Sequence, residues 1–169
     1  MKRIITIFIL PITLYSCGQA PVKKTEYPLQ VGDIYFDPKI DDPSFKLCDE
    51  NRVLQYYNFG KGLLYKGEKV KLNEHFKDGL IKKEQKKETG FLTVRFIVNC
   101  EGKPGRYRVQ GMDYEYKEKK FNNDLTSQLL SLTKQLDGWM IGEYEGKAYD
   151  YYQYLTFKIE NGKLIEIMP

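Results

Sequence analysis

The feature that most constrains the fold is a leucine repeat between two segments with strand-like alternation. Four leucines recur at i, i+4, i+7 and i+11, namely Leu125, Leu129, Leu132 and Leu136. This spacing predicts an amphipathic helix, which Asn122 or Asn123 caps and Asp137-Gly138 ends. Residues 91–98 and 151–159 carry apolar side chains at alternate positions, which predicts two strands that each bury one face.

Two predicted hairpins complete this pattern. Residues 99–103 form a turn after the first strand, and Tyr107–Val109 returns as its partner. Asn161-Gly162 predicts a two-residue turn of the primed type, because both central residues need positive φ, and residues 163–168 pair back. The order strand, strand, helix, strand, strand predicts an α+β fold. We expect a small antiparallel sheet with one or two helices packed on one face.

An N-terminal extension, residues 31–72, is expected to pack on this domain, which spans residues 73–169. Pro and Gly motifs mark turns in the extension, and residues 53–59 and 63–65 are strand candidates. Apolar residues then share one helical face, which predicts a helix over residues 72–88.

The first sixteen residues have the layout of a secretory signal. Two cations precede an apolar run of about a dozen residues, and the small Ser16 follows it. Leu14-Tyr15-Ser16-Cys17 resembles the lipobox of bacterial lipoproteins, in which the cysteine takes a diacylglyceryl group and becomes the new N-terminus. The resemblance implies that residues 1–16 are removed and that Cys17 is lipidated. It also implies attachment to the bacterial cell envelope, at the outer membrane and facing the periplasm.

Two alternatives to lipidation were weighed. A transmembrane anchor needs about 20 apolar residues, whereas residues 4–14 are too few and contain Pro11. An ordinary cleaved signal with an incidental cysteine is the second alternative, and Tyr15 is larger than is usual at that lipobox position. Residues 17–30 are short, polar and interrupted by prolines, which predicts a tether between lipid and domain.

The other two cysteines form an even pair once Cys17 is lipidated. An oxidising envelope favours a disulfide between Cys48 and Cys100. Such a bond would contribute about 4 kcal/mol on the chain-entropy model. The alternative is two buried free thiols.

The charge balance argues against nucleic-acid binding. The whole chain has a net charge of +4, and loss of Lys2 and Arg3 with the signal leaves +2. The charges are intermixed and form no basic stripe. We therefore expect no nucleic-acid partner.

The sequence gives no support for catalysis or for a cofactor. His75 is the only histidine and lies in a charged segment without a motif, so a Ser-His or Cys-His arrangement is not indicated. HExxH, CxxC and Walker motifs are missing. Asp37, Asp41 and Asp42 do not follow EF-hand spacing, and we interpret them as a solvated turn. We expect neither enzymatic activity nor a bound metal or cofactor.

A run of tyrosines is the one surface candidate: Tyr149, Tyr151, Tyr152 and Tyr154. As strand residues, Tyr152 and Tyr154 share the face opposite Tyr151. Two exposed rings there would stack on a sugar or a peptide. The alternative is ordinary cross-strand packing against Tyr107 or Phe96.

The order of motifs in the second half of the chain follows a recognisable pattern. The motifs are Gly90–Asn99, Gly102, the leucine helix, Trp139, Gly146-Lys147 and Tyr154–Phe157. This order resembles the C-terminal domain of TonB-type proteins and covers roughly residues 75–160. The resemblance implies that Asn99, Gly102, Trp139, Gly146 and Lys147 maintain that fold. It also implies strand addition, in which an edge strand binds an extended segment of an outer-membrane transporter.

Three features depart from that family. A lipid anchor and a short tether replace an inner-membrane helix and a long proline-rich segment, so energy transduction is not expected. Met140-Ile141-Gly142 replaces the usual proline after the tryptophan. The additional Asn161-Gly162 hairpin is placed to cover the edge that family members leave free.

These observations predict a lipid-anchored binding or scaffolding module without catalytic activity. The expected partner is an outer-membrane or periplasmic protein, and the candidate contacts are Tyr152, Tyr154 and Trp139. The alternative is binding of cell-wall glycan or peptide through the tyrosine-rich strand face. If the Asn161-Gly162 hairpin leaves a sheet edge unpaired, strand addition is favoured. If the hairpin covers that edge, binding of cell-wall glycan is favoured.

Overall fold

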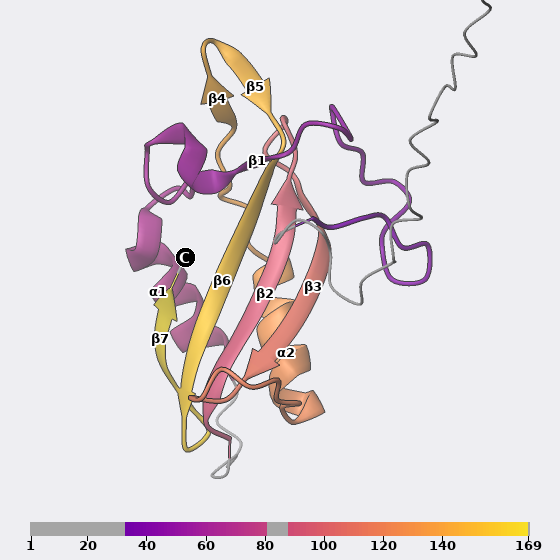
Figure 1. The fold of residues 1–169 in the computed structure, drawn as a ribbon. Coiled ribbons are helices and arrows are strands. Elements are labelled where there is room, and N and C mark those ends of the chain that lie inside the picture. The colour runs from indigo at the N-terminus through magenta and orange to yellow at the C-terminus, as the bar shows by residue number, and fades with distance from the viewer. Residues whose placement is uncertain (1–32, 81–87, 169) are drawn as a thin grey trace, which may run out of the picture. The chain divides into compact units, whose positions relative to one another are not determined.

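The structure is a computed structural model that describes residues 33–80 and 88–168 (Figure 1). The expected signal peptide, the lipidation site Cys17 and the tether lie outside the described residues. All the described residues belong to one compact unit, so the N-terminal extension is part of the same body as the domain that follows it.

Residues 33–80 and 88–168 form two α-helices, one 3-10 helix and seven strands. In chain order they are β1 (Leu54–Gln55), the 3-10 helix η1 (Tyr56–Phe59), α1 (Glu68–Gly79), β2 (Gly90–Val98), β3 (Pro104–Met112), α2 (Asn123–Lys134), β4 (Gly142–Tyr144), β5 (Lys147–Tyr149), β6 (Tyr151–Glu160) and β7 (Lys163–Met168). The α+β class expected from the sequence is confirmed.

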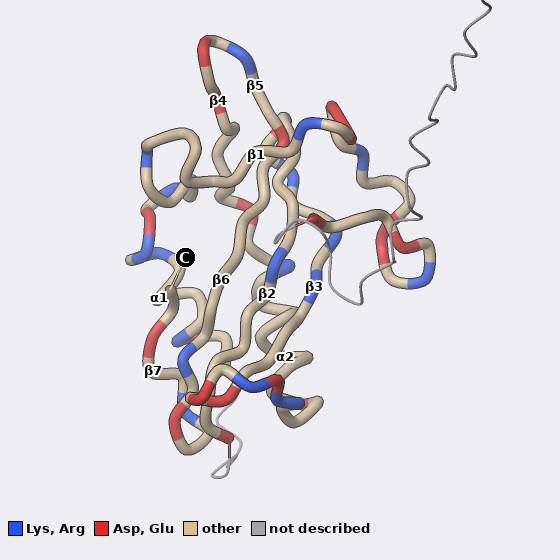
Figure 2. The backbone as a smooth tube through the Cα atoms, viewed as in Figure 1, with Lys and Arg blue, Asp and Glu red and all other residues tan. Residues whose placement is uncertain are grey.

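The main sheet has the strand order β1-β6-β2-β3, and β7 pairs with β6 on the side where β1 lies. β6 and β2 are antiparallel along their whole length, from Gly90 opposite Ile159 to Val98 opposite Tyr151. β1 runs parallel to β6 for two residues, so the sheet is mixed and not wholly antiparallel as expected. Acidic and basic residues are interspersed along the chain (Figure 2).

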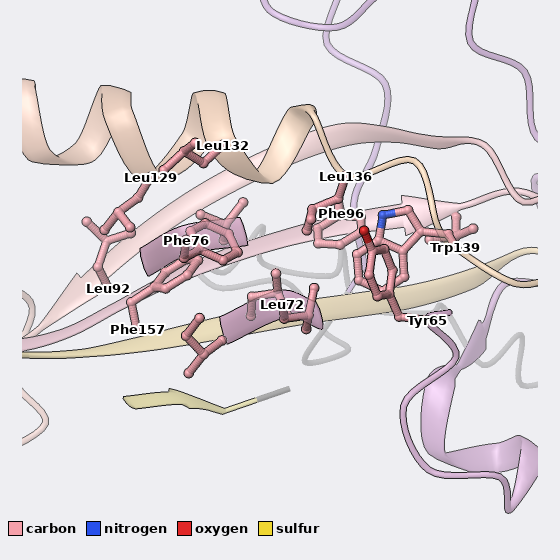
Figure 3. Packing of buried hydrophobic residues seen from close by; sticks show 14 of the residues in the cluster. Tyr65, Leu72, Phe76, Leu92, Phe96, Leu129, Leu132, Leu136, Trp139 and Phe157 are labelled. Atoms are coloured by element: carbon pink, nitrogen blue, oxygen red, sulfur yellow. The ribbon is translucent and has the colours of Figure 1, made fainter. Parts of the chain in front are cut away.

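Both helices cover the same face of this sheet, and the main core lies between the two layers. α2 contributes its leucines and α1 contributes Leu72 and Phe76, which meet the alternate residues of β2 and β6 (Figure 3). The Phe76 ring packs edge-on against Phe157 at 4.8 Å. Full burial of each such side chain stabilises the fold by about 1.5–3 kcal/mol.

The leucine helix begins as its sequence predicts. The side chain of Asn122 caps α2 by accepting a hydrogen bond from the backbone N–H of Asp124 at 2.8 Å. The helix ends at Lys134, two residues before Leu136, but Leu136 is still buried in the core.

Two elements in the first half differ from their predictions. The strand expected over 53–59 pairs for only two residues, and the chain then continues as η1. A capping box begins η1: the side chains of Gln55 and Asn58 each accept a hydrogen bond from the backbone N–H of the other residue. The expected helix starts earlier, at Glu68, and its cap Leu80 is already extended. Residues 81–87 of that prediction lie outside the described residues.

Two tight turns use positive φ as their sequences require. Asn161 and Gly162 have φ of 50° and 75° and connect β6 to β7, which confirms the predicted hairpin. Glu145 and Gly146 have φ of 50° and 73° and connect β4 to β5. The second hairpin was expected only as a Gly-Lys turn.

Candidate ligand-binding face

The face of the sheet turned away from both helices carries the candidate site, and we call it the outer face. It is formed by every second residue of β2 and β6: Phe91, Thr93, Arg95 and Ile97, opposite Lys158, Thr156, Tyr154 and Tyr152. Their neighbours along each strand point into the main core. The two halves of the outer face differ in what covers them.

Residues 33–53 cover the half that contains Ile97 and Tyr152. Ile34 packs there with both of them, and Phe45, Leu47 and Val53 surround the cluster. The Tyr152 ring is buried, and its hydroxyl bonds to Asp33 at 3.3 Å. The expectation of an exposed ring at Tyr152 is therefore wrong, because the N-terminal extension covers it.

The other half, from Arg95 and Tyr154 to Phe91 and Lys158, has half-exposed side chains at every position except the buried Thr93, and we call it the open face. Tyr154 lies directly opposite Arg95. Its ring packs edge-on against Tyr56 at 5.2 Å, and Tyr56 in turn contacts Tyr57, which is 57% exposed. The expected site residue Tyr154 is thus part of an accessible aromatic group whose other members come from η1.

A second aromatic group lies at the far end of the open face. Phe91 contacts the rings of Tyr114 and Tyr116, and Tyr116 is 74% exposed. The hydroxyl of Tyr114 donates to a carboxylate oxygen of Glu160 at 3.0 Å. Phe91 is four residues from Arg95 along β2, so the two aromatic groups lie about 13 Å apart. Between them, the hydroxyls of Thr93 and Thr156 bond across the strands at 3.0 Å.

Arginines gather on β2 and β3 beside the open face (Figure 2). Arg108 donates to both carboxylate oxygens of Asp41 at 2.7 Å and to the backbone carbonyl of Tyr35. The hydrogen bond from Arg108 lowers the pKa of the Asp41 carboxyl, against the opposing effect of burial. Arg106, at a bulge of β3 with φ of 53°, pairs with Glu50.

Arg95 differs from these two arginines. Within residues 33–80 and 88–168, no carboxylate pairs with Arg95. Its Nη2 is buried without a hydrogen-bond partner, as is Nε of Arg106, so the missing carboxylate is what distinguishes Arg95. It lies directly opposite Arg108 on β3. Two guanidinium groups therefore share this part of the sheet with the single carboxylate of Asp41.

The edge of β6 that strand addition would require is paired with other strands except at residues 153–155. β1 pairs at Tyr151 and Tyr152, and β7 pairs from Thr156 to Glu160. Between these strands, the buried Gln153 side chain donates to the backbone carbonyl of Tyr154 at 3.0 Å and replaces a strand partner. By the criterion set from the sequence, this edge does not favour strand addition.

The outer edges of β3 and β7 carry features that discourage pairing. On the outer edge of β3, residues 118 and 119 of the described chain pair with Met112 and Gly111. The rest of this edge has no strand partner among the described residues, and the bulge at Arg106 interrupts it. β7 is short, has an irregular register and is tied to α1 by the Lys69–Glu166 ion pair. Bulges, charges and shortness are the usual means by which edge strands avoid new partners.

The predicted disulfide between Cys48 and Cys100 is present, and it joins the N-terminal extension to the turn between β2 and β3. Beside it, the buried carboxylate of Asp150 accepts three backbone hydrogen bonds of 2.8 Å, from Cys48, Asp49 and Cys100. The two cysteines and Asp150 form the one cluster of metal-ligand type in the described ranges. Both thiols are consumed by the disulfide, so this cluster is structural.

Trp139 is buried in the main core, where its ring contacts Tyr65 and Phe96 (Figure 3). It therefore offers no surface for a partner, contrary to its listing among the candidate contacts. Its role is structural, as the resemblance also implied.

His75 and the aspartates of the extension have local structural roles. The ring Nε2 of His75 lies 2.9 Å from the carbonyl of Leu132 and joins α1 to α2. Asp37 and Asp42 accept hydrogen bonds from residues two positions ahead, and Asp41 pairs with Arg108. The bonds of Asp37 and Asp42 agree with the interpretation as a solvated turn, whereas that interpretation is wrong for Asp41, which is buried in its pair with Arg108.

We compared the chain with protein-family models, curated proteins and solved structures, and none of the three comparisons returned a match. The likeness to TonB-type domains rests on motif order alone and stays a prediction. In the described ranges, no helix has the length and apolar character needed to cross a bilayer.

The sequence interpretation missed the roles of four residues described above. Tyr56 and Tyr57 were assigned to a strand, although Asn58 and Gly60 nearby are typical of a turn. Arg95 was placed on the polar side of its strand, but its lack of an acidic partner becomes visible only when the strands are in register. Asp150 carried no local signal.

Proposed function

We propose that this protein is a lipid-anchored binding module of the bacterial cell envelope and that it binds cell-wall peptidoglycan through the open face. The observation that carries the proposal is the contrast between a largely paired β6 edge and an open face lined by aromatic rings. Strand addition needs a free edge, whereas sugar rings and peptides are bound by stacking on exposed aromatics.

The envelope location is supported by two independent features. The lipobox-like segment ending at Cys17 is expected to hold the chain to a membrane, and stable anchoring requires more than one acyl chain. A disulfide such as Cys48–Cys100 persists in oxidising compartments, which include the periplasm. The tether of residues 17–30 would let the domain reach about 40 Å from the membrane surface.

The proposal is tested by co-sedimentation of the full chain with insoluble peptidoglycan, using the Cys17→Ser variant to keep it unlipidated. We expect the chain to sediment with peptidoglycan and Tyr57→Ala/Tyr154→Ala to lose most of that binding. Tyr144→Ala is the matched control, because Tyr144 is an exposed tyrosine on β4 and is expected to change nothing.

A pull-down from envelope extract gives the competing outcome. In that outcome, the parent and the Tyr57/Tyr154 double variant capture an outer-membrane transporter or another envelope protein equally well. That result contradicts the proposal and supports a protein partner. For the anchor, Cys17→Ser is expected to leave the membrane fraction. Retention in that fraction contradicts lipidation.

A further inference from the structure

Arg95 has an uncompensated positive charge inside a crowded part of the outer face. Arg108 lies opposite it on one side and Tyr154 on the other. Like charges directly opposite each other across two strands destabilise a sheet. Asp41 and Glu50 neutralise Arg108 and Arg106, which leaves Arg95 without an acid within residues 33–80 and 88–168.

This arrangement is unfavourable in the absence of a ligand. A buried guanidinium nitrogen without a hydrogen-bond partner costs stability, because it has lost water and gained nothing in return. Arg95 as a whole is half-exposed, so a ligand on the open face that supplies a negative charge offsets the charge of its guanidinium. The planar fork of a guanidinium is suited to a carboxylate, which it binds through two parallel hydrogen bonds.

The surroundings of Arg95 define what should carry the carboxylate. Among the described residues at this place, the guanidinium of Arg95 has the one positive charge without an acidic partner. A single positive charge matches a monoanion better than a doubly charged phosphate. The Tyr154 ring lies beside it and meets the Tyr56 ring edge-on at 5.2 Å, so the two rings form an aromatic corner next to Arg95. Burial, followed by the neighbouring Tyr56, raises the pKa of Tyr154, and its hydroxyl is engaged in a hydrogen bond with Tyr56, so the Tyr154 ring and not its hydroxyl is available to a ligand.

We propose that Arg95 recognises a carboxylate attached to a sugar ring that stacks beside it on Tyr154, as in the lactyl-substituted sugars of peptidoglycan strands from which the stem peptides have been removed. The inference rests on the proposed function and adds the chemical group that is recognised. It assigns charge recognition to Arg95 and ring contact to the tyrosines.

The test uses a pair of probes that differ in charge alone, N-acetylmuramic acid and its neutral amide, in ligand-detected NMR titrations of the full Cys17→Ser chain. We expect the acid to bind about tenfold more tightly than the amide, as one charge-assisted hydrogen-bond pair allows. Arg95→Gln should remove this preference, and Arg95→Lys should retain part of it. The control is Lys147→Gln, which removes an exposed cation on β5 and should leave the preference unchanged.

Several outcomes overturn the inference. They are equal binding of acid and amide by the parent chain, a preference that survives Arg95→Gln, or no binding of either probe. If peptidoglycan co-sedimentation persists in such a case, the proposed function stands and the role of Arg95 alone is rejected. Arg95→Gln is also expected to raise the melting temperature slightly, because it removes the uncompensated charge; a marked fall would assign Arg95 a purely structural role.

Discussion

Asp150 Oδ1 accepts a hydrogen bond from the backbone N–H of Cys100 at 2.8 Å, directly beside the disulfide that Cys100 forms. The second oxygen of this carboxylate accepts from the extension at Cys48 and Asp49. The buried Asp150 side chain, directly before β6, therefore binds the backbone on both sides of the Cys48–Cys100 disulfide. Residues 33–53, which cover half of the outer face, are held to the sheet by this junction of Asp150 and the disulfide.

Removing the Asp150 carboxylate should loosen this junction. We expect Asp150→Ala to lower the free energy of unfolding by about 3 kcal/mol, since three backbone donors lose a charged acceptor. Urea denaturation measures the change. Glu143→Gln, at an exposed carboxylate on β4, should stay within about 0.5 kcal/mol of the parent. A change equally small for Asp150→Ala would refute the structural role given to this residue.

The disulfide should contribute a similar amount. Replacement of both cysteines in Cys48→Ser/Cys100→Ser is expected to lower the free energy of unfolding by about 4 kcal/mol, because a long loop is no longer constrained in the unfolded chain. Alkylation followed by mass analysis of the unreduced, denatured chain should find neither cysteine modified. Modification of both would show that the bond does not form.

The Arg108–Asp41 pair predicts a specific acid sensitivity. Its hydrogen bond keeps the pKa of Asp41 below the ordinary value of 3.8 in the folded chain. The pair therefore stabilises the fold fully above that value, and this contribution is lost as the pH falls through the lower folded pKa. Asp41→Asn should flatten the fall in stability between about pH 5 and pH 2.

Asp78→Asn is the matched control for this titration, because Asp78 is an exposed aspartate on α1. It should leave the slope of stability against pH unchanged. If the Asp41→Asn slope also equals that of the parent, the ion pair makes no contribution in solution.

The elements that were predicted correctly are those with local signals. Asn122 caps α2, the leucines follow a helical period, and Asn161-Gly162 takes the positive φ values that its turn demands. The strand expected over 53–59 proved to be only the two residues of β1, and β4 and β5 were not predicted as strands because each is only three residues long. Segments that short carry too little alternation to reveal a strand.

The candidate site was predicted less well, and Tyr152 shows why. Alternation correctly separates the two faces of β6, but it does not tell which part of the outer face another segment will cover. Residues 33–53 cover Tyr152 and leave Tyr154 half-exposed two residues away. Likewise, the closure of the β6 edge by β1, Gln153 and β7 depends on pairing between segments far apart in the sequence.

The central claim is that ligand contacts the open face and not a sheet edge, and photo-crosslinking in cells tests it directly. A photoreactive phenylalanine analogue at position 57 replaces an exposed tyrosine beside the open face, and the same analogue at position 165 replaces the exposed Ile165 of β7. The account predicts crosslinks to peptidoglycan from position 57 and none from position 165. Crosslinks to an envelope protein from position 165, with none to peptidoglycan from position 57, would contradict it.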